Sequence, residues 1–358
     1  MTFFTPGPAA LYPTYEKHLK SFMDQQLGSI SHRSQSYRDL HKFTVEQLRT
    51  LLSVPDTHQI LFLGSASEIW ERILLNCVEH ESFHLVNGSF SQKFRDYADA
   101  LRKYTHGLEK PMGEGFEAAE VTVPEYAEII CATHNETSAG VQMQVADIHK
   151  LKTKYPDKLL AVDMVSSAPY PALDYSLVDT AFFSVQKAFG MPAGLGVWIV
   201  NEQCLAKAER LKQYENLTIG AHHDLPTLWK FAQKHETPAT PNVMAIYILG
   251  KIAEDFNRIG INALRKETEH KAGLLYNFVK KHENFDASVK EPRLQSKTVV
   301  VANTKIDSSA IIGKLKEKGM VIGSGYGEFK SSQVRIANFP ATSVAQTDGL
   351  VQALERLF

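Results

Sequence analysis

The 358-residue chain has little cysteine and little net charge. Its three cysteines, Cys77, Cys131 and Cys204, are scattered without metal-type spacing, so we expect reduced thiols, a cytoplasmic protein and no metal site. No uninterrupted apolar run approaches the roughly 20 residues that a membrane helix needs. A formal net charge of −1 gives no electrostatic reason to bind nucleic acid or an anionic membrane. We therefore expect neither as a partner.

Internal repeats and low-complexity tracts are also absent, and the opening MTFFTPGPAALYPTYEK lacks the cationic and apolar regions of a secretory signal. What the sequence does contain is an alternation of apolar, strand-like runs with helical stretches. The runs cover 59–64, 83–88, 127–133, 158–164, 180–185 and 196–200. Strands that alternate with helices predict βαβ units and a mainly parallel sheet covered on both faces.

The chain is long enough for one large and one smaller domain. Residues 1–15 contain three closely spaced prolines and a glycine, which predict an extended arm packing on the small domain. Residues 16–245 carry the strand–helix alternation and form the expected large domain. Residues 246–358 begin with long amphipathic helices and end in further strands and helices, which predicts a smaller α+β domain.

Two charged residues follow apolar runs that we expect to be neighbouring strands. Asp163 ends the run KLLAVDM, and Lys187 follows TAFFSVQ. Each has an ordinary explanation, a turn aspartate and a lysine that points into water. In open α/β sheets, however, ligands bind at the carboxyl ends of the strands. The separation of the two residues is about one strand and a connection, so adjacent strand ends could hold both.

Three further segments lie at expected strand ends. Gly64–Ser67 opens a helix and would bind an anion through backbone N–H groups and two hydroxyls, or would be a plain serine N-cap. Phe90 would cover a flat ligand or pack in the core. Thr137, in THNETSAG, would contact a ligand or merely form a turn.

Pyridoxal 5′-phosphate requires this combination of groups. It needs a lysine for the Schiff base, an acid at the pyridine nitrogen, an anion site for its phosphate and a stacking face. The lysine must be partly desolvated or near other cations, so that its pKa falls and a free amine is present.

The chain resembles the class V, fold type I pyridoxal-phosphate enzymes, most closely the phosphoserine aminotransferases, over nearly its whole length. The similar segments, in order, are TPGPAAL, SHRSQSY, THNETSAG, AVDMVSS, SVQKAFGMPAG, HETPATPN and QVRIANFP. The resemblance implies a large domain with a mainly parallel seven-stranded sheet between helices, a smaller α+β C-terminal domain, and a homodimer with shared active sites.

The resemblance also implies the role of each site residue. Lys187 would form the Schiff base and move the proton, and Asp163 would pair with the pyridinium nitrogen. Thr137 would hydrogen-bond the ring hydroxyl, and Phe90 would stack where the family usually has tryptophan. The cofactor phosphate would be held by Ser65, Ala66, Ser67 and Gln186, with Thr237 of a partner chain. The substrate would be bound by Arg335 through its carboxylate and by His32 and Arg33 through its distal group.

Two departures concern the substrate. The Gly-rich loop is GSAS and lacks the arginine usual in phosphoserine aminotransferases, and Glu236 replaces the family's asparagine before Thr237. We expect an aminotransferase that uses glutamate as donor and 3-phosphohydroxypyruvate as the favoured acceptor, in serine biosynthesis. A serine- or alanine-glyoxylate-type aminotransferase, in which His32 and Arg33 would serve a carboxylate or position the N-terminal arm, and a class V lyase remain alternatives. A solvated or dimer-interface position is the ordinary explanation for Arg33.

Other classes of protein fit less well. A desulfurase needs a reactive cysteine on a mobile loop, and GSGYGEFKSS at 323–332 has none. The same segment holds the only dinucleotide-type glycine string, which is not followed by a helix pattern. A catalytically inactive scaffold would not need Lys187 and Asp163.

Overall fold

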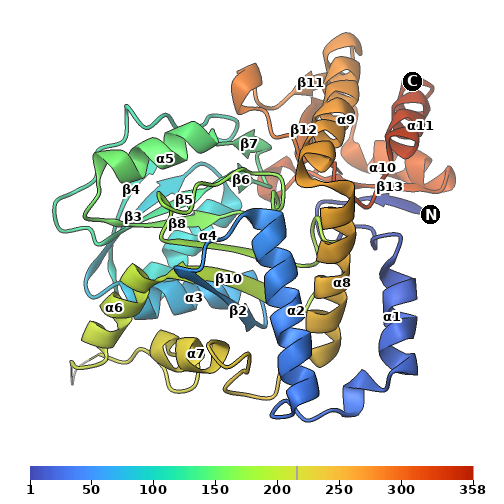
Figure 1. Cartoon of the computed structure of the whole chain (residues 1–358). Coiled ribbons are helices and arrows are strands. Elements are labelled where there is room, and N and C mark those ends of the chain that lie inside the picture. The colour runs from blue at the N-terminus through green and yellow to red at the C-terminus, as the bar shows by residue number, and fades with distance from the viewer. Residues whose placement is uncertain (215–216, 358) are drawn as a thin grey trace.

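The computed structural model describes residues 1–214 and 217–357 (Figure 1). Seven strands form the large sheet, in the order β2-β10-β9-β8-β5-β3-β4. Only β10 runs antiparallel to its neighbours. The strands are β2 (His58–Leu63), β3 (Glu81–Val86), β4 (Tyr104–Glu109), β5 (Ile129–Thr133), β8 (Leu159–Asp163), β9 (Thr180–Ser184) and β10 (Gly196–Asn201). The expected mainly parallel seven-stranded sheet is confirmed.

Helices cover both faces of this sheet, as the apolar strands require. Alternate residues of β8 face opposite ways: Leu160 and Val162 join one core, and Leu159 and Ala161 join the other. The first core is closed by α2 (Gln35–Leu52), α5 (Val145–Lys154) and α8 (Val243–Ile259). The second is closed by α3 (Ala66–Cys77), α4 (Ser89–Ala100), α6 (Glu202–Leu211) and α7 (Leu225–Ala232).

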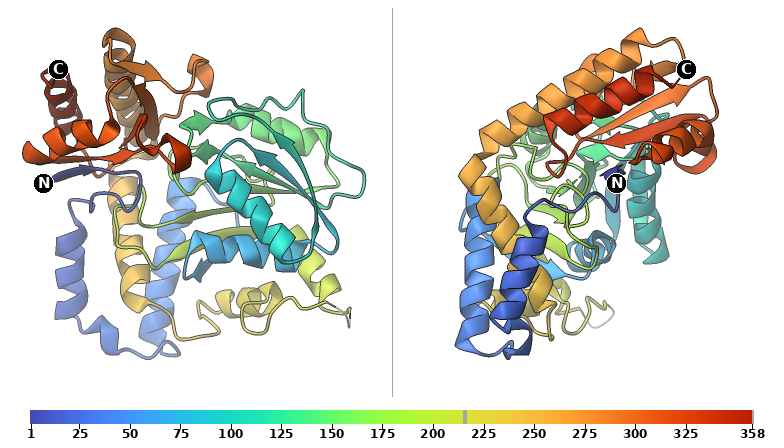
Figure 2. Two further views of the ribbon diagram at one scale, coloured as in Figure 1. Left: turned by 180° about the vertical axis from the view of Figure 1, so that it is seen from behind. Right: turned by 90° about the vertical axis from the view of Figure 1, so that its right-hand side faces the viewer.

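A second sheet has five strands in the order β1-β13-β14-β12-β11. Its strands are β1 (Thr2–Phe4), β11 (Phe285–Ala287), β12 (Val299–Thr304), β13 (Met320–Ser324) and β14 (Gln333–Ala337). Three helices pack on it, with one apolar core between them: α9 (Ile261–Lys281), α10 (Ser308–Glu317) and α11 (Val344–Glu355). Figure 2 shows this layer beside the large sheet, with the N-terminal strand running along it.

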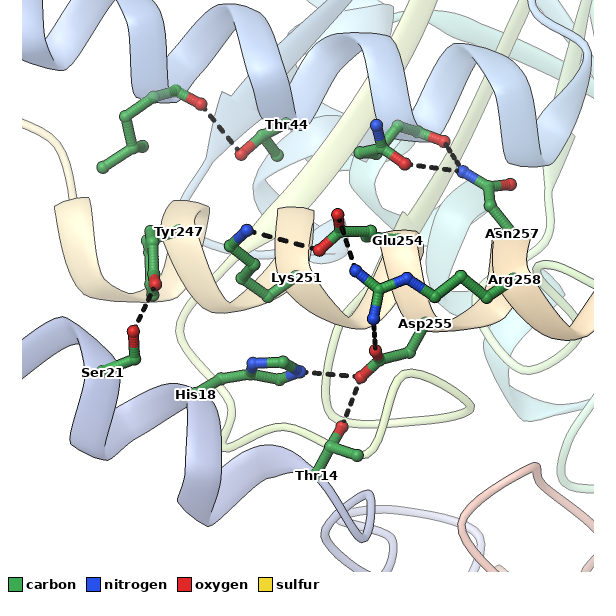
Figure 3. A network of polar contacts seen from close by, with 12 residues as sticks. Thr14, His18, Ser21, Thr44, Tyr247, Lys251, Glu254, Asp255, Asn257 and Arg258 are labelled. Atoms are coloured by element: carbon green, nitrogen blue, oxygen red, sulfur yellow. Dashed lines mark hydrogen bonds and ion pairs between the residues drawn. The ribbon is translucent and has the colours of Figure 1, made fainter.

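The N-terminal segment connects the two sheets. β1 pairs in parallel with β13, and the chain then crosses to α1 (Tyr15–Asp24), which packs on α8. In Figure 3, Asp255 of α8 accepts hydrogen bonds from the hydroxyl of Thr14 at 2.6 Å and from the ring of His18 at 2.7 Å. Ser21 lies 3.0 Å from the hydroxyl of Tyr247. These contacts fix where the arm begins its path across the large domain.

Two short strands, β6 (Asn135–Glu136) and β7 (Val141–Gln142), pair with each other outside both sheets. Single turns of 3₁₀ helix lie at Leu27–Ser29, Pro292–Leu294 and Gly327–Lys330. Within the described residues, no helix combines the length and apolar character needed to cross a membrane.

Candidate active site

A cavity with about 570 Å³ of empty space lies at the carboxyl ends of β5, β8 and β9. It is lined by eight of the residues singled out in the sequence: Ser65, Ala66, Ser67, Phe90, Thr137, Asp163, Gln186 and Lys187. Trp70, Thr133, Asn135, Val165 and Ser184 complete the lining. The chain therefore brings together, in one place, the groups that the sequence placed at the ends of separate strands.

Lys187 does not point into open water. Its Nζ donates a hydrogen bond of 2.6 Å to the carbonyl of Pro6, in the N-terminal arm. Burial lowers the pKa of Lys187 from 10.5 to about 8, assisted by the positive charge of Arg335 and opposed by Asp163 and Glu136. A substantial fraction of this side chain is consequently a neutral amine, and a nucleophile, near pH 8.

Asp163 is the last residue of β8 and is only 3% exposed. Its two oxygens accept hydrogen bonds from the backbone N–H of Val165, at 2.9 Å, and from Nε1 of Trp70, at 3.1 Å. Burial raises its pKa from 3.8 to about 7, in spite of these bonds. No ion pair to this carboxylate is formed within the described residues, so a cation bound in the cavity would find it unpaired.

Trp70 is a site residue that the sequence analysis missed. It lies on α3, one turn beyond Ala66, with its ring stacked on Phe94 at a centroid distance of 5.7 Å. Residues four apart share one face of a helix. That spacing, applied to the expected anion-binding helix start, is the signal that would have placed Trp70 at the cavity.

The start of α3 shows both explanations that the sequence left open for Gly64–Ser67. The Ser65 hydroxyl accepts from the backbone N–H of Glu68 at 3.1 Å, as an ordinary N-cap does. At the same time Ser65, Ala66 and Ser67 line the cavity, at the positive end of the helix dipole. The backbone N–H of Ala66 already donates to the hydroxyl of Ser184 at 2.9 Å, so β9 and the helix start are joined here.

Glu136 stabilises the opposite wall of the cavity, and the sequence analysis did not predict this role. Its fully buried carboxylate accepts from the backbone N–H groups and the hydroxyls of Ser91 and Ser138, and from the backbone N–H of Phe90. A buried carboxylate with five donors is well satisfied. It thereby ties the start of α4, which carries Phe90, to the turn that carries Thr137.

Arg335, on β14, lies on the side of the second sheet that faces Lys187. Its Nε donates to the carbonyl of Ser324 at 2.7 Å, and its guanidinium lies 5.3 Å from the centroid of the Tyr326 ring. Phe90 in turn lies 5.4 Å from Tyr326 and 5.8 Å from Nζ of Lys187, measured from its ring centroid. The candidate carboxylate-binding arginine and the candidate stacking ring are thus neighbours through Tyr326.

Besides Arg335, three of the expected residues do not line this cavity. Arg33 donates to the Glu236 carboxylate at 2.9 Å and to the carbonyls of Thr237 and Pro238 at 2.7 and 3.0 Å. Thr237 lines a different opening, together with Gly64 and Gly194, and His32 lines neither of these openings. Within a single chain, none of these three residues lines the opening that Lys187 lines.

The negative charge of Glu236, which replaces the family's asparagine, is balanced by neighbouring arginines. Arg38 contacts one oxygen of this carboxylate at 2.6 Å, and Arg33 contacts the other. The Arg38 guanidinium, followed by that of Arg33, holds the pKa of Glu236 below its usual value. The carboxylate remains ionised and paired, so its charge is balanced within the chain.

Comparison with known proteins identifies the family. The sequence model described as "Aminotransferase class-V" matches residues 110–337. The chain belongs to the class V aminotransferases. A crystal structure of a phosphoserine aminotransferase from Cytophaga hutchinsonii is 46% identical, covers 99% of this chain and 98% of its own, and superposes with a TM-score of 0.97.

More distant relatives support the same family assignment. A phosphoserine aminotransferase from Nocardioides sp. is 26% identical over 98% of this chain and 94% of its own length. An aspartate aminotransferase from Thermus thermophilus, at 21% identity with full coverage of both chains, has the same fold with a TM-score of 0.85. The expected fold type I architecture and aminotransferase activity are confirmed for this class V aminotransferase.

Proposed function

We propose that this aminotransferase uses pyridoxal 5′-phosphate to transfer the amino group of glutamate to 3-phosphohydroxypyruvate, which gives phosphoserine and 2-oxoglutarate, in the reaction that serves serine biosynthesis. The observation that supports this cofactor is a single cavity lined by both Lys187 and Asp163. The pKa of Lys187 is about 8 and that of Asp163 is about 7. The substrate is supported by the 46% identical phosphoserine aminotransferase.

The donor set of the cavity fits the cofactor. The unpaired, buried carboxylate of Asp163 suits a protonated ring nitrogen, which would supply the missing cation. Ser65, Ala66 and Ser67 would hold the phosphate at the start of α3, Thr137 would bond the ring hydroxyl, and Phe90 would cover the ring. Gln186, which also lines the cavity, would assist at the phosphate.

When bound, the cofactor supplies an aldehyde for the amino group and an electron-poor ring that stabilises negative charge at the substrate α-carbon. Residues of the chain itself would bind the substrate and move the proton. Arg335 would bind the α-carboxylate of the substrate through its two terminal guanidinium nitrogens, which have no hydrogen-bond partner within the described residues. Lys187 would hold the cofactor and would act as the general base that moves the proton of the substrate α-carbon. Asp163 would keep the ring nitrogen protonated throughout.

We also propose a homodimer with shared active sites, in the cytoplasm. The support is the location of Thr237, His32 and Arg33 outside the Lys187 cavity of their own chain, since a second chain is then needed to supply a phosphate-binding threonine. Size-exclusion chromatography with light scattering tests this proposal. A monomer with full activity would refute it.

A class V lyase of the desulfurase type is disfavoured. All three cysteines are buried in the protein core, and none lines the cavity. An alanine–glyoxylate type of aminotransferase shares the fold, as the structure from Nostoc sp. shows at 20% identity. Such an enzyme would need no site for a second anionic group, because its amino-acid substrate has none.

A half-reaction panel tests the substrate. The cofactor-loaded protein would be mixed in turn with phosphoserine, glutamate, serine and alanine, while its visible absorption is followed. We expect phosphoserine and glutamate to convert the absorption rapidly. If phosphoserine leaves the spectrum unchanged while serine or alanine converts it, the proposed substrate is wrong.

A further inference from the structure

The carboxylate of Glu236 is shared by two arginines from a distant part of the sequence. Glu236 and the adjacent Thr237 are both 8% exposed. Arg33, 203 positions away, donates to one carboxylate oxygen at 2.9 Å. Arg38 donates to the other oxygen from Nε at 2.8 Å and from Nη2 at 2.6 Å. Charge-assisted hydrogen bonds at both oxygens fix the geometry of the Glu236 side chain.

Arg33 also binds the backbone of the same segment. Its Nη1 donates to the carbonyl of Thr237 at 2.7 Å, and its Nη2 donates to the carbonyl of Pro238 at 3.0 Å. Its guanidinium lies 4.8 Å from the centroid of the Phe231 ring, on α7. One guanidinium therefore contacts the chain on both sides of Glu236, and the position of Thr237 depends on where Arg33 lies.

The two arginines lie at the start of α2. Arg38 is in the first turn of this helix, and Arg33 directly precedes its N-cap, Ser34. The 235–242 segment begins less favourably, because His235 has a φ of +56°. A residue other than glycine rarely adopts this left-handed conformation and needs contacts elsewhere to offset the strain. The bonds from Arg33 and Arg38 to Glu236 and the backbone supply such contacts.

Glu236 also has an electrostatic effect of the opposite sign. A carboxylate repels a phosphate bound nearby, and here it offsets the charges of Arg33 and Arg38 as well. If charge were its sole influence, its removal would strengthen phosphate binding. Its hydrogen bonds favour the reverse, because they fix the segment that carries Thr237. The two effects therefore predict changes of opposite sign when Glu236 is replaced by a neutral residue.

We propose that Glu236 is a positioning residue for cofactor binding. Through Arg33 and Arg38 it fixes the 235–242 segment, so that Thr237 of one chain is placed to bind the cofactor phosphate in the other. This inference rests on the proposed function. The benefit of a fixed threonine outweighs the repulsion between carboxylate and phosphate, which explains how this chain uses glutamate where related enzymes have asparagine.

The first test compares pyridoxal 5′-phosphate with pyridoxal, which lacks the phosphate, in equilibrium titrations of the cofactor-free protein. We expect Glu236→Gln to raise the dissociation constant of pyridoxal 5′-phosphate about tenfold, because the charge-assisted bonds that fix Thr237 are weakened. The dissociation constant of pyridoxal should not change. Glu236→Asp, which keeps the charge, should recover most of the affinity. Glu209→Gln, at an exposed position on α6, is the control and should change neither value.

Thr237→Val completes a double-mutant cycle. Alone, this change should weaken the binding of pyridoxal 5′-phosphate by a factor similar to that of Glu236→Gln. Combined with Glu236→Gln, it should cause little further loss, because both changes remove the same contact with the phosphate. Additive losses would show that the carboxylate does not act through Thr237.

A second test reports on the segment without any cofactor. Lys234 is exposed and directly precedes the 235–242 segment. We expect trypsin to cleave after Lys234 faster in cofactor-free Glu236→Gln than in the wild type or in Glu209→Gln, because local opening of the chain exposes the bond. Mass spectrometry of the fragments measures this rate.

Three outcomes of these tests overturn the proposal. The first is equal or tighter binding of pyridoxal 5′-phosphate by Glu236→Gln, which would leave charge as the only effect of Glu236. The second is an equal loss of affinity for pyridoxal, which would indicate a general effect on the fold. The third is cleavage after Lys234 at the wild-type rate. If Thr237→Val alone leaves cofactor binding unchanged, the shared site of the proposed function fails, while the cleavage rate still decides whether Glu236 fixes the segment.

Discussion

Asp163→Asn should stabilise the cofactor-free protein by an amount that grows with pH. In the folded chain the pKa of Asp163 is raised from 3.8 to about 7 by burial, and one pKa unit corresponds to about 1.4 kcal/mol. A carboxyl group with a raised pKa favours the folded state fully below pH 3.8 and loses that contribution as the pH rises through 7. Asparagine does not titrate, so the difference between the two proteins isolates this loss.

The magnitude follows from the two pKa values. At pH 5.5 the unfolded wild type ionises Asp163 and the folded one does not, which destabilises the wild type by about 2 kcal/mol. Above pH 7 both states are ionised, and the deficit levels off near 4 kcal/mol. Asparagine also loses one of the two bonds from Val165 and Trp70, at about 1 kcal/mol, but that cost is the same at every pH. The advantage of the variant should therefore grow by about 2 kcal/mol between pH 5.5 and 8.5.

Urea unfolding of the cofactor-free proteins at a fixed protein concentration measures this difference. Asp96→Asn, at an exposed position on α4, is the control and should show no such trend. Parallel stability curves for the wild type and Asp163→Asn would refute the reasoning. In the presence of the cofactor the sign should reverse, because the variant lacks the charge that the bound ring needs.

Three further outcomes are expected. Gly7→Ala, at φ +150° with its added carbon 2.3 Å from Nζ of Lys187, should displace the amine from its position beside the Pro6 carbonyl and weaken the equilibrium binding of pyridoxal phosphate about tenfold, the equivalent of one hydrogen bond; an unchanged affinity would contradict this. Acylation of Lys187 in the cofactor-free protein, followed by mass spectrometry, should reach half its maximum rate near pH 8, because only the neutral amine reacts. A midpoint above pH 10 would exclude this environment. Trp70→Phe should keep the packing on α4 but remove a donor from Asp163, and so weaken cofactor binding about tenfold; equal affinity in an equilibrium titration would argue against that hydrogen bond.

Much of the fold followed from apolar runs. The strands β5, β8 and β9 were predicted because parallel strands buried on both faces read as continuous apolar segments. Strand β4 was not predicted, because its sequence YTHGLE is polar and its residues are partly exposed at the edge of the sheet. An edge strand buries little, so its sequence carries little of the apolar pattern.

The candidate site followed the same logic. Asp163 and Lys187 were placed together because the carboxyl ends of neighbouring parallel strands meet. Glu136 and Trp70 were missed as site residues because their roles depend on partners distant in sequence. Glu136 accepts a hydrogen bond from Ser91, for example, and Trp70 donates one to Asp163. Such contacts appear only when the chain is folded.

The pairing of β1 with β13 has a consequence for the order of assembly. Thr2 lies beside Met320, so almost the whole chain must be synthesised before the N-terminal strand finds its partner. Contacts of such long sequence separation form late in folding. Until they form, Pro6 does not cover Lys187, and the nascent large domain leaves its amine accessible. The cofactor can then bind before folding is complete. The N-terminal segment covers the site afterwards, when β1 docks on β13.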